Sequence, residues 1–162
     1  MVEYEVEDGP SALQSDLEAF VRLVRIGGAV NVNYVRQGIR RDGAKLVLAR
    51  IDNEIIGVAA LKIPATTYRD SIGGTGKSGH PLPPDQYPFE LGYVSVTPTC
   101  GGRGIARTLI GKVIELSDGQ GLFATTSNVA MRKALLPSAG FERVGTSWLN
   151  EENERLHLYA LR

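Results

Sequence analysis

The first forty residues hold short apolar patterns separated by turn residues. Residues 4–7 (YEVE) predict a strand that ends at Asp8, with Ser11 as the N-cap of the next element. A helix is predicted there because apolar residues recur at helical spacing, at Leu13, Leu17, Phe20, Val21 and Val24. Gly27-Gly28 ends it, and a second, shorter helix is expected over about 31–41.

A hairpin and a long loop follow. Residues 45–51 (KLVLARI) and 54–63 (EIIGVAALKI) both read as strands, and Asp52-Asn53 between them is typical of a tight turn. Residues 65–88 carry many glycines, prolines, serines and threonines without any period. We therefore expect a long loop there, of a kind that is usually functional or disordered.

The second half of the chain alternates strands with helices. The patterns predict strands over 89–96, 122–127, 141–148 and 155–161, a helix over 103–117, and a helix after Asn128 that breaks near Pro137. The strand–helix–strand units in this order imply a parallel pair of strands within a mixed sheet. We expect one α/β (α+β) domain over 1–162, with helices on both faces of a central mixed sheet.

Composition and charge argue against one class of function, the binding of nucleic acid. The chain is 43% hydrophobic and 22% charged, and 18 Lys and Arg balance 18 Asp and Glu. This balance argues against nucleic acid as the partner, because such binding depends on a clearly basic face. One third of the chain does gather basic residues, which we interpret as the solvated face of two helices: Arg22, Arg25, Arg36, Arg40, Arg41, Lys45 and Arg50.

The expected compartment is the cytoplasm. The single cysteine, Cys100, excludes an internal disulfide and fits a reducing compartment. No stretch is long and apolar enough to cross a bilayer, and the N-terminus lacks an apolar signal core. Two histidines and one cysteine also make a metal site a poor expectation.

Two glycine-rich runs compete as phosphate-binding loops. The first, SIGGTGKSGH at 71–80, ends like a P-loop in Gly76-Lys77-Ser78, but Ser71 stands where that pattern needs a glycine. Prolines after it forbid the helix whose N-terminus would face the anion, so we interpret it as a surface loop. The second, CGGRGIAR at 100–107, follows a strand and opens an amphipathic helix. Its amides can converge on an anion, and Arg103 and Arg107 can add charge-assisted hydrogen bonds, so we place the phosphate there.

This second run resembles the signature of GNAT-type acyl-CoA-dependent N-acetyltransferases. In that family a strand ending V-x-P precedes Q/R-x-x-G-x-G/A at the start of a long helix. This chain has Val96-Thr97-Pro98 and then GGRGIA at 101–106. An asparagine opening the next helix and a later G-F complete the resemblance, here Asn128 and Gly140-Phe141. The order of elements also matches, so the resemblance covers nearly the whole chain.

The resemblance implies the GNAT fold, with acetyl-CoA as cosubstrate in an opening between the strands at 90–97 and 122–127. The pyrophosphate would meet the amides of 102–106, and the pantetheine would pair with the backbone of 94–96 as an added strand does. Asn128 would contact the pantetheine or the thioester end. The implied cofactor-binding residues are Val94, Ser95, Val96, Gly101, Gly102, Arg103, Gly104, Ile105, Ala106, Arg107 and Asn128.

Two departures from the family pattern bear on activity. Gly101 occupies the Q/R position, so a side chain that often braces the loop is absent, and we expect weaker cofactor binding rather than none. Leu136, followed by Pro137, stands where many members carry a tyrosine that protonates the departing thiolate. The acid is therefore unassigned, or unnecessary.

Two residues of the 89–96 strand are the catalytic candidates. Glu90 is the expected base, which would take a proton from the ammonium form of the acceptor directly or through a water, unless it is a strand-end charge facing solvent. Tyr93 could be the acid, although strict alternation puts it on the opposite face from Glu90 unless a bulge intervenes. Otherwise Tyr93 belongs to the core. The Val94 amide could stabilise the oxyanion.

These features predict an N-acetyltransferase that moves an acetyl group from acetyl-CoA to a primary amine by direct attack in a ternary complex. Two alternatives remain: a catalytically inactive CoA-binding or protein-interaction module of the same fold, and a nucleotide-binding protein that uses Lys77. The acceptor would be a small-molecule or peptide amine bound by the 31–41 helix and the 65–88 loop. The alternating last strand, 155–161, could pair across the edge of a homodimer.

Overall fold

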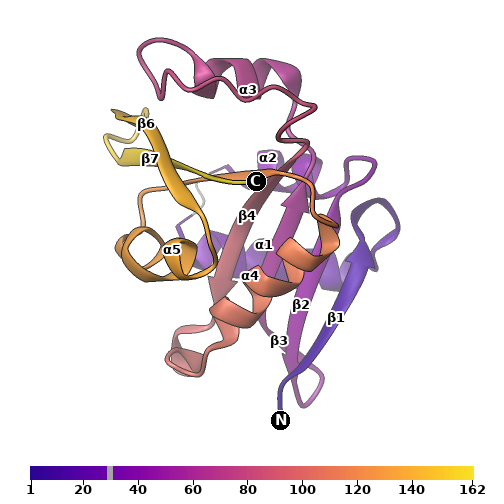
Figure 1. The fold of residues 1–162 in the computed structure, drawn as a ribbon. Coiled ribbons are helices and arrows are strands. Elements are labelled where there is room, and N and C mark those ends of the chain that lie inside the picture. The colour runs from indigo at the N-terminus through magenta and orange to yellow at the C-terminus, as the bar shows by residue number, and fades with distance from the viewer. Residues whose placement is uncertain (29–30) are drawn as a thin grey trace. The chain divides into compact units, whose positions relative to one another are not determined.

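The computed structural model describes residues 1–28 and 31–162. It contains a seven-stranded mixed sheet, as the sequence predicted, and the strands follow the order β1-β2-β3-β4-β5-β7-β6. Figure 1 shows the course of the chain from the indigo β1 to the yellow β7. The strands are β1 (Glu3–Asp8), β2 (Lys45–Ile51), β3 (Glu54–Lys62), β4 (Phe89–Val96), β5 (Leu122–Thr126), β6 (Glu142–Leu149) and β7 (Arg155–Leu161). The parallel pair is β4 with β5, as expected from the strand–helix–strand unit.

The helices are α1 (Gln14–Ile26), α2 (Val32–Ile39), α3 (Thr66–Gly73), α4 (Ile105–Leu116) and α5 (Leu136–Ser138), with the π-helical turn η3 (Met131–Leu135) and the 3-10 turns η1 (Gly9–Ser11) and η2 (Pro98–Cys100). The chain forms two compact units, residues 1–63 with 91–116 and residues 64–90 with 117–162. Among the described residues, no helix has the length and apolar character needed to span a membrane.

The first unit buries both faces of β2 and β3. Leu48 and Val58 point to the face on which Phe20 of α1 and Ile39 of α2 complete an apolar core. On the opposite face a Cβ added at Gly57 would lie 3.1 Å from both Ile105 and Leu109 of α4. Because side chains alternate along a strand, α1 and α2 cover one face and α4 the other. The predicted two-sided cover is confirmed for this unit.

The second unit is built on β5, β7 and β6. Phe123 and Leu158 lie on one face and pack in a cluster with Ile72 of α3 and Trp148 of β6. Tyr159 points to the other face, where its hydroxyl donates a hydrogen bond of 3.3 Å to the Arg132 carbonyl in η3. Helical segments therefore lie on both faces of this part of the sheet as well.

Helix α3 was not predicted from the sequence, which indicated an irregular loop over 65–88. The buried residues of the helix are Ile72 and Arg69, which is only 4% exposed. The helix therefore lacks the continuous row of apolar residues that marks most packed helices. The Arg69 guanidinium donates to the carbonyls of Leu82 (3.0 Å) and Tyr87 (2.6 Å), so it anchors α3 to the proline-rich segment after it. A search for apolar periodicity cannot find a helix that packs through an arginine.

The hairpin and the helix ends follow turn chemistry with one exception. Asp52 and Asn53 have φ of 50° and 68°, the left-handed pair that a tight hairpin turn needs. Asn31 caps α2, since its side chain accepts a 3.1 Å hydrogen bond from the amide of Tyr34. The expected cap at Ser11 was wrong: Ser11 ends the turn η1, and α1 begins at Gln14 without a side-chain cap.

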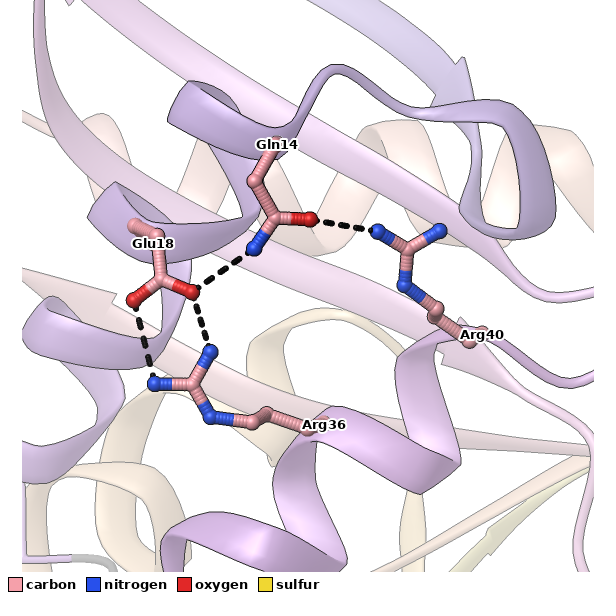
Figure 2. A network of polar contacts seen from close by, with 4 residues as sticks. All are labelled: Gln14, Glu18, Arg36 and Arg40. Carbon is pink, nitrogen blue, oxygen red and sulfur yellow. Dashed lines mark hydrogen bonds and ion pairs between the residues drawn. The ribbon is translucent and has the colours of Figure 1, made fainter.

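A polar network on the surface joins α1 to α2 (Figure 2). The Glu18 carboxylate accepts hydrogen bonds from Gln14 (2.9 Å) and from both terminal nitrogens of Arg36, one of them at 3.0 Å. Arg40 donates to the Gln14 side-chain oxygen at 2.9 Å. The Arg36 hydrogen bond lowers the pKa of Glu18. Two of the clustered basic residues thus have partners within the chain, which supports their interpretation as a solvated helix face.

Three carboxyl groups converge on Arg50 beside β1. Arg50 forms ion pairs with Glu5 and, at 2.8 Å, with Asp16 of α1. Glu7 shares a hydrogen bond with Asp16, and its other oxygen is buried without a partner among the described residues. Burial, followed by the contact with Asp16 and the charges of Asp16 and Glu5, raises the pKa of Glu7 to about 7, although Arg50 opposes the shift.

The Glu7 carboxyl should make stability depend on pH. The pKa of Glu7 is raised from 4.5 to about 7 on folding, so the folded protein holds an extra proton between these values. The free energy of unfolding should therefore fall as pH rises from about 4.5 to about 7, by about 2 kcal/mol after allowance for solvent screening. Glu7→Gln should remove most of this slope and be the more stable form at pH 8, as measured by urea unfolding at several pH values. Glu54→Gln is the control at an exposed strand end, and equal slopes in wild type and Glu7→Gln would contradict the account.

Candidate active site

The glycine run at the start of α4 forms an open cradle of backbone. Gly102 and Gly104 have φ of 78° and 75°, in the left-handed region that favours glycine. Both are exposed, and a Cβ added at either would meet no atom within 4 Å. The first helical hydrogen bond runs from the Thr108 amide to the Gly104 carbonyl (3.1 Å). The amides of Ile105 and Ala106 precede it, so they have no helical acceptor and belong to the positive end of the helix.

The neighbouring predicted residues are placed in different ways. Arg103 and Arg107 are exposed beside the cradle. The Gly101 amide donates to the Pro98 carbonyl (3.3 Å), so it closes the turn η2 instead of facing the cradle. The Gly101 amide is thus already engaged within the protein.

Strand β4 leads into this cradle and is hydrogen-bonded to neighbouring elements at its end. The Ser95 hydroxyl donates to the Leu23 carbonyl at the end of α1 (2.9 Å), and the Thr97 amide donates to the Ile56 carbonyl of β3 (2.7 Å). Val94, Ser95 and Val96 are all half-buried. Any ligand contact made by Ser95 would therefore use its backbone, as strand addition requires.

Tyr93 interrupts the regular alternation of β4. Its φ of 57° lies in the left-handed region, so the strand is not uniformly extended at this residue. The ring contacts Phe20 edge-on with a centroid distance of 6.1 Å, and the Lys62 ammonium lies 4.4 Å from the ring centroid. A Cβ at Gly38 of α2 would lie 3.2 Å from the Tyr93 hydroxyl. Tyr93 thus packs against the core of the first unit, as the alternative interpretation expected.

Glu90 is a buried carboxyl group in the second unit. It is only 2% exposed, so the interpretation of a strand-end charge facing solvent was wrong. It pairs with Phe123 in the short parallel register between β4 and β5. The Tyr68 hydroxyl of α3 donates a 2.8 Å hydrogen bond to Glu90 Oε2. The Glu90 charge also opposes the effect of burial, which lowers the pKa of Arg69.

Asn128 and Leu136 have local structural roles. The Asn128 side-chain oxygen accepts from the Met131 amide (2.9 Å), so Asn128 caps the helical segment after β5, and the residue is exposed. Leu136, at the position where the family often has tyrosine, is fully buried. It belongs to the core, and its side chain has no proton to donate.

The P-loop-like run at 71–80 is a packed connection. Lys77 donates to the Ser71 hydroxyl at 2.7 Å, and Ser78 is 2% exposed. The Ser78 hydroxyl donates to the Ile72 carbonyl (2.6 Å), and its own carbonyl accepts from the Thr146 amide (2.9 Å). The run begins within the last turn of α3 and does not follow a strand, which agrees with the choice of the other glycine run.

A shallow hollow of about 240 Å³ lies in the second unit, lined by Arg69, Asp70, Gly73, Pro81, Leu82, Pro83 and Pro84. It belongs to the 65–88 segment that was expected to bind the acceptor. Its walls are mainly apolar, and Asp70 is exposed at its edge. Among the described residues, no group of three or more His, Cys, Asp or Glu side chains could hold a metal ion.

The family model described as "Acetyltransferase (GNAT) family" matches residues 23–141. Escherichia coli ElaA has a similar structure, with 15% identity, TM-score 0.74 and full coverage of both chains. The ribosomal-protein-alanine N-acetyltransferase of Brucella melitensis is 21% identical, with TM-score 0.65 over 97% of this chain and 98% of that one. A GNAT family acetyltransferase from Elizabethkingia anophelis with acetyl-CoA bound is 16% identical, with TM-score 0.64 over 99% and 97%. No curated protein matches the sequence.

Proposed function

We propose that this chain, which belongs to the acetyltransferase (GNAT) family, transfers an acetyl group from acetyl-CoA to a primary amine. Acetyl-CoA supplies the activated thioester, and the protein supplies binding, orientation and proton transfer. The observation that carries the proposal is the pair of open left-handed glycines, Gly102 and Gly104, at the start of α4 within the family signature.

The cradle would hold the pyrophosphate of acetyl-CoA. Amides of 102–106 would donate to its oxygens, and the exposed Arg103 and Arg107 would add charge-assisted hydrogen bonds. The backbone of Val94–Val96 would pair with the pantetheine, while Asn128 would donate through its side-chain nitrogen, since its oxygen is occupied by the Met131 amide.

Glu90 would act as the general base. The acceptor reaches the thioester as an ammonium ion and must lose a proton before nitrogen can attack. The buried Glu90 carboxylate, fixed by Tyr68, is a suitable proton acceptor, either directly or through one water. The Val94 amide would stabilise negative charge on the carbonyl oxygen.

The acid that would protonate the leaving thiolate is Tyr93, as predicted from its place on β4. Its ring contacts with Phe20 and Lys62 also serve packing. Leu136 cannot contribute a proton. This absence of the family tyrosine favours, as a second candidate function, a catalytically inactive module that binds CoA.

Amine-dependent release of CoA tests the proposal and separates the two candidates. The purified protein is incubated with acetyl-CoA and, in turn, with a polyamine, an aminoglycoside, an amino-acid amide and a short peptide beginning with alanine. The proposal predicts that free thiol appears faster with at least one amine than without any, together with the acetylated amine in the mass spectrum. Binding of acetyl-CoA without turnover on any class of amine would favour the inactive module.

A further inference from the structure

Glu90 and Tyr68 differ greatly in their access to solvent. Glu90 is 2% exposed and Tyr68 is 37% exposed. The hydrogen bond of 2.8 Å between them therefore joins a buried carboxyl group to a hydroxyl on a side chain that reaches the surface. A buried base needs such a connection, because the proton that it accepts in each turnover must leave again.

Helix α3, which carries Tyr68, is anchored by Arg69, the residue after Tyr68. Arg69 is buried, donates to the carbonyls of Leu82 and Tyr87, and stacks with its guanidinium 5.8 Å from the Phe123 ring centroid. Phe123 is in turn the strand partner of Glu90. Phe123 is thus a neighbour of both Arg69 and Glu90, and the Tyr68 hydroxyl is already hydrogen-bonded to Glu90 without a substrate.

We propose that Tyr68 is the positioning residue of Glu90 and the route by which its proton leaves. This inference rests on the proposed role of Glu90 as base. In the resting state the Tyr68 O–H donates to the Glu90 carboxylate. When Glu90 accepts a proton from the ammonium group, the bond reverses: the Glu90 O–H donates to the Tyr68 oxygen, and the Tyr68 O–H turns to water. The Glu90 proton then transfers to the Tyr68 oxygen, and the original phenolic proton of Tyr68 leaves to water. Both groups thereby return to their starting states.

The charged groups around Glu90 do not replace this function. Arg69 of α3 interacts with the Glu90 charge but donates hydrogen bonds to the backbone carbonyls of Leu82 and Tyr87. The charge of Asp70 acts on Arg69. On β5 the residue paired with Glu90 is Phe123, which does not titrate. Because Arg69 and Asp70 are retained in a Tyr68 variant, a change seen there reports the loss of the hydroxyl.

The test compares Tyr68→Phe with Tyr4→Phe, which removes the hydroxyl of a tyrosine on β1. The ¹³C resonance of the Glu90 carboxyl group, assigned by its loss in Glu90→Gln, is compared among wild type and the two variants near neutral pH. Because Tyr68→Phe removes the hydroxyl that donates to this group, the resonance should shift in Tyr68→Phe, and Tyr4→Phe should match wild type. The acidic limb of the kcat/KM profile, measured with the best amine of the panel above, should move to higher pH in Tyr68→Phe alone, because the carboxylate has lost a hydrogen-bond donor. Calorimetric binding of acetyl-CoA should be unchanged.

The outcomes separate this inference from the proposed function. An unchanged Glu90 resonance and an unchanged pH profile in Tyr68→Phe, with Glu90→Gln inactive, would overturn the role of Tyr68 and leave Glu90 as base. Full turnover in Glu90→Gln would overturn the base itself, and the role of Tyr68 with it. A shifted Glu90 resonance together with a shifted pH profile would support both.

Discussion

Replacement of Gly104 by glutamate should abolish the binding of acetyl-CoA. The new side chain would start from a backbone with φ of 75°, and its carboxylate would enter the space that the amides of 102–106 present to the pyrophosphate. Like-charge repulsion and loss of the cradle act together. If wild type binds in the micromolar range, which is about −8 kcal/mol, we expect the Kd to rise more than 100-fold in calorimetric titration.

Gly119→Glu is the matched control for this substitution. Gly119 also has a left-handed backbone, with φ of 79°, and also has no atom within 4 Å of an added Cβ. The same strain of roughly 1–2 kcal/mol is therefore introduced in both variants. Equal weakening of acetyl-CoA binding in Gly104→Glu and Gly119→Glu would show that strain, and not the cradle, governs the effect.

Glu90→Gln should remove most of the turnover while leaving cofactor binding intact. Glutamine has nearly the same size as glutamate, and its amide oxygen can still accept the hydrogen bond from Tyr68, but it cannot accept the proton of the ammonium group. Loss of a general base typically costs 10²–10⁴-fold in rate. We expect a loss in this range in kcat/KM for the best amine, measured by thiol release, with the Kd of acetyl-CoA unchanged.

An exposed glutamate supplies the control. Glu151 lies in the turn between β6 and β7 and is exposed, so Glu151→Gln should retain wild-type turnover. If Glu90→Gln also retains it, the base is another group or the amine arrives already neutral. A weaker Kd for acetyl-CoA in Glu90→Gln would instead point to a structural role for the buried carboxyl group.

Some parts of the fold could be predicted from the sequence: those marked by a regular spacing of apolar residues, and those marked by glycines and other turn residues. The strand pattern, the long helix α4 and the tight Asp52-Asn53 turn all have local signals, because alternation, helical spacing and turn residues act within a few positions. The choice of the 100–107 run over Lys77 rested on its neighbours, a strand before it and a helix after it. The structure agrees with those neighbours.

The remaining features depend on buried polar groups whose hydrogen-bond partners lie far away in the sequence. Helix α3 escaped detection because Arg69 replaces an apolar residue at its buried position, and its acceptors lie 13 and 18 residues away. The contact between Tyr68 and Glu90 spans 22 residues and has no local signature. Ser11 failed as a cap because Pro10 directs the chain into a separate turn before α1.

Tyr93 shows an intermediate case. Strict alternation in β4 would have separated it from Glu90, and the family resemblance suggested a bulge. The left-handed backbone at Tyr93 supports an interruption of the strand, but no pattern of side chains in the sequence FELGYVSV indicates where it occurs. In the structure the Tyr93 ring contacts Phe20 and Lys62, which lie 73 and 31 residues away in the sequence, so no local pattern reports these contacts.

The most direct test of the account is calorimetric titration of the wild-type protein with acetyl-CoA and, separately, with Mg-ATP. We predict saturable binding of acetyl-CoA near the micromolar range and no heat of binding with Mg-ATP, because the glycines before α4 form the anion cradle and Lys77 is bonded to Ser71 within a packed connection. Absence of acetyl-CoA binding, or binding of Mg-ATP in its place, would contradict it.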